Sequence, residues 1–217
     1  MFIGHFAVGF ASKKLAPKTS LGVLIAAPIL LDLLWPIFLL LGWESVRIDP
    51  GNTKFTALDF VSYPYSHSLL MATGWSILFG GLYWRFRRDR KASLVVAFGV
   101  LSHWAMDALA HRPDLPITPW SNAKAGLGLW NHVAATIIIE SALFLIGVWI
   151  YAAATRSKDK TGTYVFWAFV TFLAVAYAAN IVSPPPPNVR MLALVALLTW
   201  LFPFWAGWFD RHRRADV

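Results

Sequence analysis

The chain has 217 residues, of which 58% are hydrophobic and 14% are charged. Soluble domains carry about 45–50% apolar and about 25% charged residues, so this composition, with its long apolar runs, indicates an integral membrane protein. The formal net charge of +8 alone would suit a nucleic-acid-binding protein, but the basic residues form short clusters between apolar runs. Such clusters are typical of topology signals, and we expect no nucleic-acid partner. The absence of cysteine excludes disulfides and thiolate metal ligands.

Apolar runs and turn signals divide the chain into seven helical segments. We expect them at residues 2–16, 21–42, 66–84, 92–110, 127–154, 164–182 and 189–209. The first is too short to cross a membrane, because a spanning helix needs about 20 residues. The start of the chain lacks the basic region of a secretory signal, so we expect no cleaved signal peptide.

These segments predict an all-α integral membrane protein with six transmembrane helices plus an N-terminal half-helix. We expect a single membrane domain over residues 1–217. Within it, residues 1–16 form the half-helix, residues 21–154 form four spans that carry the ionisable residues, and residues 164–209 form two accessory spans whose middles lack ionisable groups.

The first long segment carries a carboxylate in its middle. Asp32 lies near the centre of residues 21–42, with Pro28 four residues before it and Pro36 four residues after it. Prolines at these offsets remove backbone hydrogen bonds and kink a helix, which membranes tolerate where neighbouring groups or cavity water compensate. We therefore expect a kinked first span around Asp32.

Lysine and arginine are distributed unevenly between the connections. Fourteen of the 19 lie in alternate connections and the C-terminal tail, at residues 13–18, 85–91, 156–160 and 211–214. The remaining connections hold the other five. By the positive-inside rule, this pattern places both termini on the cytoplasmic side of a bacterial inner membrane.

The helical stretch at residues 102–111 organises the ionisable residues. At 100° per residue, His103, Asp107 and His111 fall within roughly 80° of one another, on one helix edge about three turns long. Two imidazoles and a carboxylate on one edge can bind a metal ion, and ionisable groups inside a membrane are functional candidates by default. The alternative is structural: Asp107 pairs with one histidine, and His111 caps the helix before Pro113.

The depth of each ionisable residue follows from its distance along a helix from the cytoplasmic end. At about 1.5 Å per residue, His5, Asp32 and His103 each lie roughly 18 Å deep, just past the midplane of a ~30 Å core. The same count places Glu140 at about 22 Å, Asp107 at about 24 Å, His67 at about 27 Å, His111 at about 30 Å and His132 at about 35 Å, at or beyond the interface. The half-helix must then enter the bilayer with its N-terminus buried in a polar cavity that opens to the outer face.

This inventory of imidazoles and carboxylates suits zinc, with manganese or iron as alternatives. We predict one to three divalent ions, bound by His5, Asp32, His67, His103, Asp107, His111 and Glu140. Structural explanations stay open for four of these residues. They are a surface position on a flexible end for His5, a counter-ion or proton relay for Asp32, an interfacial position for His67, and a hydrogen-bond acceptor role for Glu140.

These residues resemble a known group, the bacterial inner-membrane proteins described as membrane-bound metal-dependent hydrolases, LexA-regulated members included. The resemblance covers most of residues 1–154 and rests on Gly4-His5, Asp32, His67-Ser68, and the pair His103 and Asp107. More distantly, the His-x-x-x-Asp pair is similar to that of the zinc-dependent phospholipase C and P1-nuclease group, whose helical enzymes cleave phosphoesters with clustered zinc ions. The resemblance implies that the seven residues named above are ligands or near-ligands.

The chain departs from both patterns at one position each. Ser62-Tyr63 stands where many members of the first group have a further histidine, and Thr136 stands four residues before Glu140, where the phospholipase group has histidine. A one- or two-metal site is therefore as open as a three-metal site.

Together these observations predict a membrane-embedded metal-dependent hydrolase of a phosphoester, with a lipid-like or other small-molecule substrate and a site open to the periplasm. The metal would polarise the phosphoryl oxygen and supply hydroxide, and Asp32 or Glu140 would act as general base. One alternative is a proton- or cation-coupled transporter that uses the same carboxylates. Another is a non-catalytic membrane protein whose polar cluster serves assembly.

Overall fold

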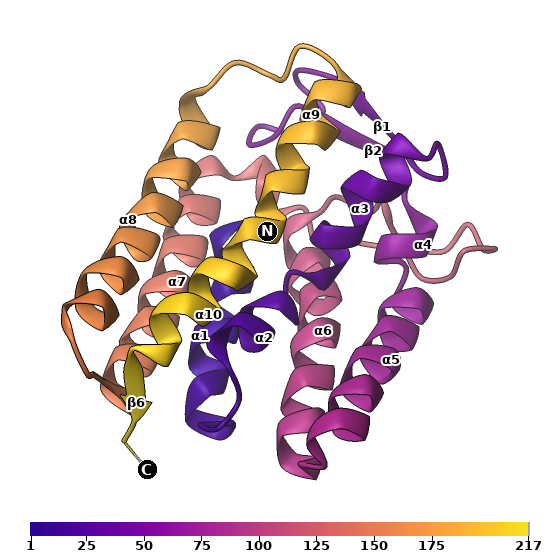
Figure 1. The fold of residues 1–217 in the computed structure, drawn as a ribbon. Helices are drawn as coiled ribbons and strands as arrows, with labels where there is room; N and C mark the ends of the chain where they lie inside the picture. The colour runs from indigo at the N-terminus through magenta and orange to yellow at the C-terminus, as the bar shows by residue number, and fades with distance from the viewer. Residues whose placement is uncertain (217) are drawn as a thin grey trace.

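The computed structural model describes residues 1–216 (Figure 1). Its elements, in chain order, are α1 (Ile3–Leu15), α2 (Leu21–Ala26), α3 (Leu30–Leu40), β1 (Ser45–Ile48), β2 (Leu58–Ser62), α4 (Pro64–His67), α5 (Leu69–Arg87), α6 (Arg90–Ala110), β3 (Leu115–Pro116), β4 (Lys124–Ala125), the 3-10 helix η1 (Leu129–Asn131), α7 (Val133–Ala154), β5 (Thr155–Ser157), α8 (Lys160–Val182), α9 (Val189–Ala196), the 3-10 helix η2 (Leu197–Trp200), α10 (Leu201–Arg211) and β6 (Arg213–Ala215).

Helix α1 is the centre of the helical bundle, and its N-terminal end lies in the interior (Figure 1). It packs against α7, α2, α6 and α8. Phe10, which is fully buried, lies among aromatic rings of α7 and α8. The close contact with α7 depends on Gly147, where a Cβ atom would lie 2.5 Å from the Ala7 carbonyl oxygen. The half-helix predicted at residues 2–16 is therefore a central, buried element.

Within residues 1–216, four helices have the length and hydropathy needed to cross a membrane: α6, α7, α8 and the continuous stretch Val189–Arg211. Their outward faces are apolar, as shown by Leu145 and Trp149 of α7, which are 64% and 69% exposed. Exposed apolar side chains of this kind suit contact with lipid. The structure is thus a mainly helical membrane bundle, while the count of six spans stays a prediction.

The first predicted span is not one helix. It separates into α2 and α3 at residues 27–29, where Pro28 supplies no N–H to continue the helix. The predicted segment 66–84 likewise starts in the short helix α4, which ends at His67, and the Ser68 side chain then caps α5.

Two further boundaries differ from the sequence prediction. The helix expected at 127–154 begins only at Val133, because Gly128 adopts a left-handed conformation (φ +73°) and η1 intervenes. The connection at 43–65 contains the antiparallel hairpin β1–β2, in which Arg47 pairs with Asp59. Two shorter antiparallel pairs, β3–β4 and β5–β6, also lie outside the helices.

The connections between the helices lie at two opposite ends of the bundle. The α1–α2 turn, the α5–α6 turn, the α7–α8 connection and β6 lie at one end, and the β1–β2 hairpin and the α8–α9 connection lie at the other (Figure 1). The four basic clusters are in the first group. We refer to this end as the basic end.

Candidate metal centre

The site is built on the edge of α6 that carries His103, Asp107 and His111. The Oδ2 atom of the buried Asp107 lies 3.0 Å from His103 Nε2 and 3.8 Å from His111 Nε2. Helical spacing alone accounts for these contacts, because residues four apart lie one above the other. The predicted polar edge is therefore present in the fold.

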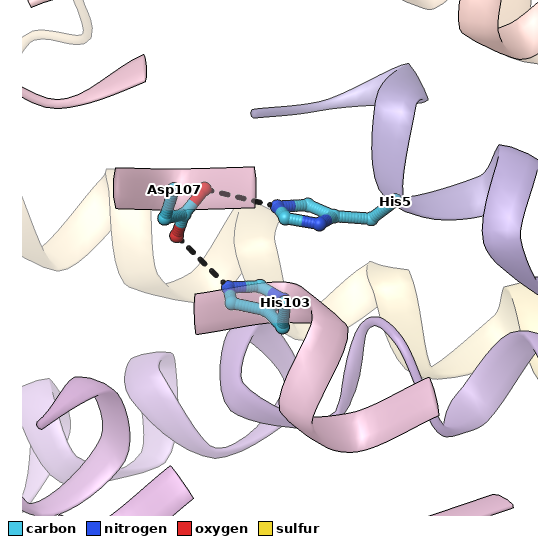
Figure 2. A group of neighbouring side chains, drawn as sticks. All are labelled: His5, His103 and Asp107. Atoms are coloured by element: carbon cyan, nitrogen blue, oxygen red, sulfur yellow. Dashed lines mark hydrogen bonds and ion pairs between the residues drawn. The ribbon is translucent and has the colours of Figure 1, made fainter. Parts of the chain in front are cut away.

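Helix α1 brings a third histidine to Asp107. The Nε2 atom of His5 lies 3.1 Å from Asp107 Oδ1, and its ring stacks on that of His103 with centroids 3.8 Å apart (Figure 2). The Met1 amino group also contacts Asp107 Oδ1. The interior end of α1 therefore meets α6 at one carboxylate.

Helices α3 and α4 supply the remaining members. His67, the last residue of α4, places its Nε2 atom 3.2 Å from His103 Nε2 and 3.6 Å from Asp32 Oδ1. Asp32, in the first turn of α3, is also 3.8 Å from His103 Nε2. Residues from four helices, far apart in the sequence, thus converge within a few ångströms. Two triads have ligand atoms close enough for one ion each: His5 with His103 and Asp107, and Asp32 with His67 and His103.

Three of the four imidazoles are oriented by an acceptor at Nδ1. His103 Nδ1 lies 2.8 Å from the Pro28 carbonyl, His67 Nδ1 lies 2.7 Å from Ser66 Oγ, and His111 Nδ1 lies 3.0 Å from Asp114 Oδ1. A carbonyl or carboxylate partner requires the proton on Nδ1, which leaves the Nε2 lone pair directed at the cluster. This arrangement is typical of metal-ligating histidines.

The fit to a metal ion can be tested on the distances between donors. Tetrahedral zinc with bonds of about 2.0–2.2 Å separates its ligand atoms by about 3.3–3.6 Å. Five pairs among His67 Nε2, His103 Nε2, Asp32 Oδ1 and Asp107 Oδ2 lie between 3.0 and 3.8 Å. Two imidazole acceptors 3.2 Å apart with no proton between them repel unless a cation lies near both. The five distances bracket the range for tetrahedral zinc, so the donor set is compatible with a divalent ion.

Glu140 lies at the buried end of α1, next to the cluster, and is in neither of the two triads. Its Oε2 atom accepts hydrogen bonds from the backbone N–H of Phe2 at 2.8 Å and of Gly4 at 3.4 Å, so it caps the buried end of α1. The Oε1 atom has no hydrogen-bond partner among residues 1–216. His132 is exposed at the start of α7, outside the cluster as expected.

Sequence reasoning missed the residues that orient the histidines. Ser66 donates to Glu44 Oε2 at 2.6 Å, so that His67, Ser66 and Glu44 form a chain. Burial raises the pKa of Glu44, while its hydrogen bonds from Ser66 act against that rise. The position of Ser66 beside His67 was the only local signal, since Glu44 is 22 residues from Ser66.

Asp114 plays the corresponding part for His111. Tyr63 donates to Asp114 Oδ1 at 2.9 Å, and the Arg112 Nε atom donates to Oδ2 at 3.0 Å. Burial opposes ionisation of Asp114, but hydrogen bonds from His111 and Tyr63 outweigh it and hold the pKa of Asp114 below its usual value. The Arg112 guanidinium continues to Asp59 of β2 at 2.6 Å, which ties the outer hairpin to the end of α6.

The cluster reaches the protein surface through one side chain. The Asp32 side chain is 39% exposed, whereas those of His5, His67, His103 and Asp107 are at most 4% exposed. Asp32 follows the α2–α3 break and is the member of the cluster with the most exposed side chain.

The fold and the site define a helical membrane protein with a buried histidine and carboxylate cluster. The family model described as YdjM inner membrane protein matches residues 64–184. Because this match covers more than half of the chain, the protein belongs to the YdjM family and is a bacterial inner membrane protein. Comparison with curated proteins and with solved structures gave no match. The matched region contains His67, His103 and Asp107, whereas His5 and Asp32 precede it.

Proposed function

We propose that this protein is a membrane-embedded, metal-dependent phosphoester hydrolase. The observation that carries the proposal is the convergence of the Nε2 atoms of His67 and His103 with the carboxylates of Asp32 and Asp107, while both Nδ1 atoms are held by other acceptors. Buried carboxylates and imidazoles are costly inside a bilayer. A divalent ion, zinc above all, would offset that cost and explain why the residues are grouped.

The residues of the cluster have two proposed roles, metal binding and general-base catalysis. His67, His103 and Asp107, with His5 and His111 close by, would hold the one to three ions that the donor inventory allows. A divalent ion held there polarises a phosphoryl oxygen and lowers the pKa of a nucleophilic water. Of the two carboxylates predicted as general base, Asp32 is the better placed, because it is partly exposed, whereas Glu140 accepts backbone hydrogen bonds from α1.

The position of Asp32 favours a lipid substrate. Asp32 lies at the α2–α3 break and not in an outer loop, so an amphiphilic phosphoester that already resides in the membrane reaches it most directly. The resemblance of the sequence to the phospholipase C and P1-nuclease group implies the same type of reaction, the hydrolysis of a phosphoester. Membrane phospholipids are therefore the first substrates to assay.

We also propose six spans with the basic end in the cytoplasm and the site open to the periplasmic side. The sequence has no cysteine, so single cysteines can report the side without a background signal. With Lys160→Cys on the α7–α8 connection and Lys54→Cys on the β1–β2 connection, a membrane-impermeant maleimide added to intact spheroplasts should label only Lys54→Cys. Labelling of Lys160→Cys alone would reverse the orientation.

The deciding experiment measures metal per chain by mass spectrometry on detergent-purified protein. We expect one to three zinc or similar ions in the wild type and loss of metal in His103→Ala with Asp107→Ala. The matched control is His212→Ala with Asp159→Ala, which removes a histidine and aspartate pair 2.7 Å apart at the basic end and should keep the metal. If the double variant misfolds, His103→Ala alone replaces it, because it removes one proposed ligand and leaves the Asp107 carboxylate in place.

A transporter is the second candidate, and the α2–α3 break favours it. Broken helices beside an intramembrane carboxylate are typical of ion-coupled carriers. Well-folded wild type without metal after zinc resupply, together with ion flux in proteoliposomes that Asp32→Asn abolishes, would replace the hydrolase by a carrier. Bound metal with release of a phosphorylated headgroup from phospholipid that Asp32→Asn abolishes would support the hydrolase.

A further inference from the structure

A groove of about 820 Å³ runs between α5 and α6 at their basic end. The two helices meet closely at its floor: a Cβ atom on Gly80 would lie 2.8 Å from Ala97 Cβ. The walls are apolar and exposed, with Ile77 at 68% and Leu94 at 59%. Gly81 also lines the groove and has open space where a side chain would be. The volume is within the range of about 300–1,000 Å³ seen for small-molecule sites.

Cationic side chains stand at the mouth of this groove. Arg90 and Lys91, at the start of α6, line it and are exposed. Neither makes an ion pair or a side-chain hydrogen bond within residues 1–216. The neighbouring acid, Asp89, caps α6 by accepting from the Ala92 N–H, and the Arg88 guanidinium lies 5.2 Å from the centroid of the Trp84 ring. An apolar trough therefore ends at two exposed cations that have no acidic partner among residues 1–216.

We propose that this groove binds one anionic phospholipid, with an acyl chain against Ile77, Gly81 and Leu94 and the phosphate at Arg90 and Lys91. Charge complementarity selects this occupant, because basic residues beside spanning helices attract anionic headgroups. Trp84 lies at the mouth, where aromatic rings occupy the interface. The site is separate from the histidine cluster and does not depend on the proposed hydrolase activity.

A second copy of the chain is the competing occupant, and the charges argue against it. In a twofold dimer within a membrane, the same surface of each copy meets the other at the same depth. Arg90 and Lys91 of the two copies would then face their equivalents without acidic partners. An anionic lipid removes this repulsion.

The test measures lipid retention by native mass spectrometry on the full chain in detergent. The probes are dioleoyl phosphatidylglycerol, which is anionic, and dioleoyl phosphatidylcholine, which is zwitterionic. We expect the wild type to retain one phosphatidylglycerol in preference to phosphatidylcholine. Arg90→Gln with Lys91→Gln should weaken phosphatidylglycerol binding about 30-fold, from roughly fivefold per cation. The control variant, Arg85→Gln with Arg214→Gln, also removes two positive charges at the basic end, but outside the groove. It should bind phosphatidylglycerol as the wild type does.

A second pair of variants tests the trough itself. Gly81→Phe places a ring in the groove without a clash, because no atom lies within 4 Å of its Cβ position, and it should abolish retention. Gly74→Phe, equally unobstructed on the same helix but outside the groove, should leave retention unchanged. Equal retention of both lipids, wild-type binding by the Arg90 and Lys91 variant, or a dimer that only Gly81→Phe dissociates would each overturn the proposal.

Discussion

Two buried polar clusters attach α1 to the rest of the bundle, one near each of its ends. At the basic end, Asp210 accepts from Lys13 Nζ at 2.7 Å, from the Leu21 N–H at 2.9 Å and from the Tyr151 hydroxyl at 2.9 Å. At the interior end, Asp107 and Asp32 face imidazole nitrogens whose protons are engaged elsewhere. Both clusters are charged and largely buried. The Met1 amino group and His5 contact Asp107 Oδ1, but Asp32 Oδ1 and Asp107 Oδ2 face the Nε2 atoms of His67 and His103, so the second cluster is only partly balanced by its own donors.

The difference between the two clusters distinguishes a structural ion pair from a candidate functional site. The Lys13 and Asp210 cluster matches each acceptor oxygen with a donor, which is what a structural ion pair requires. In the histidine cluster, the Nε2 lone pairs of His67 and His103 point at each other across 3.2 Å. A cation, either a metal ion or an extra proton on an imidazole, is needed to make this arrangement favourable. The balance of donors and acceptors, rather than burial, marks the candidate site.

The largest effect on stability is expected from a substitution that breaks the Lys13 and Asp210 cluster. Asp210→Ala leaves the Lys13 ammonium buried without its carboxylate, and we expect a loss of about 3–5 kcal/mol in the free energy of unfolding. Thermal unfolding in detergent would measure it, and metal content should not change. Lys13→Met with Asp210→Leu should recover most of the loss, because removing both charges leaves none unpaired. Loss of metal in Asp210→Ala would show that the two clusters are not independent.

A second prediction concerns the response of stability to zinc. Ligand binding to the folded state alone stabilises it by about 2.7 kcal/mol at 100 times the dissociation constant. We expect zinc to raise the Tm of metal-stripped wild type and of Asp210→Ala, whose donor set is intact. His103→Ala should lose this response, and an equal Tm rise in that variant would place zinc binding outside the cluster.

The smallest expected effect removes an orienting residue. Ser66→Ala deletes the acceptor that holds His67 Nδ1, and loss of such partners costs about 10–100-fold in metal affinity. Competition with a zinc chelator would measure the affinity. Thr118→Ala, which deletes an exposed hydroxyl that donates to Ser121, is the control. An affinity equal to wild type in Ser66→Ala would mean that His67 is not a ligand.

The sequence by itself determined the features that depend on local spacing. Apolar run length and composition indicated a membrane bundle, which the family and four spanning helices support. The order of basic clusters fits their common end in the fold. The i, i+4 spacing of His103, Asp107 and His111 fixed their shared edge, because helix geometry alone sets that relation.

Only the tertiary structure decided which side chains meet across helices. A residue count gives depth along a helix but not the direction in which a side chain points, so Glu140 has a predicted depth close to that of Asp107 yet caps α1. The acceptors at His67 and His111 are near them in the sequence, Ser66 in α4 and Asp114 in the loop after α6. The acceptor at His103 is the Pro28 carbonyl at the α2–α3 break, 75 residues away. Glu44, which accepts from Ser66, is 22 residues away, and no local spacing in the sequence encodes such contacts between distant segments.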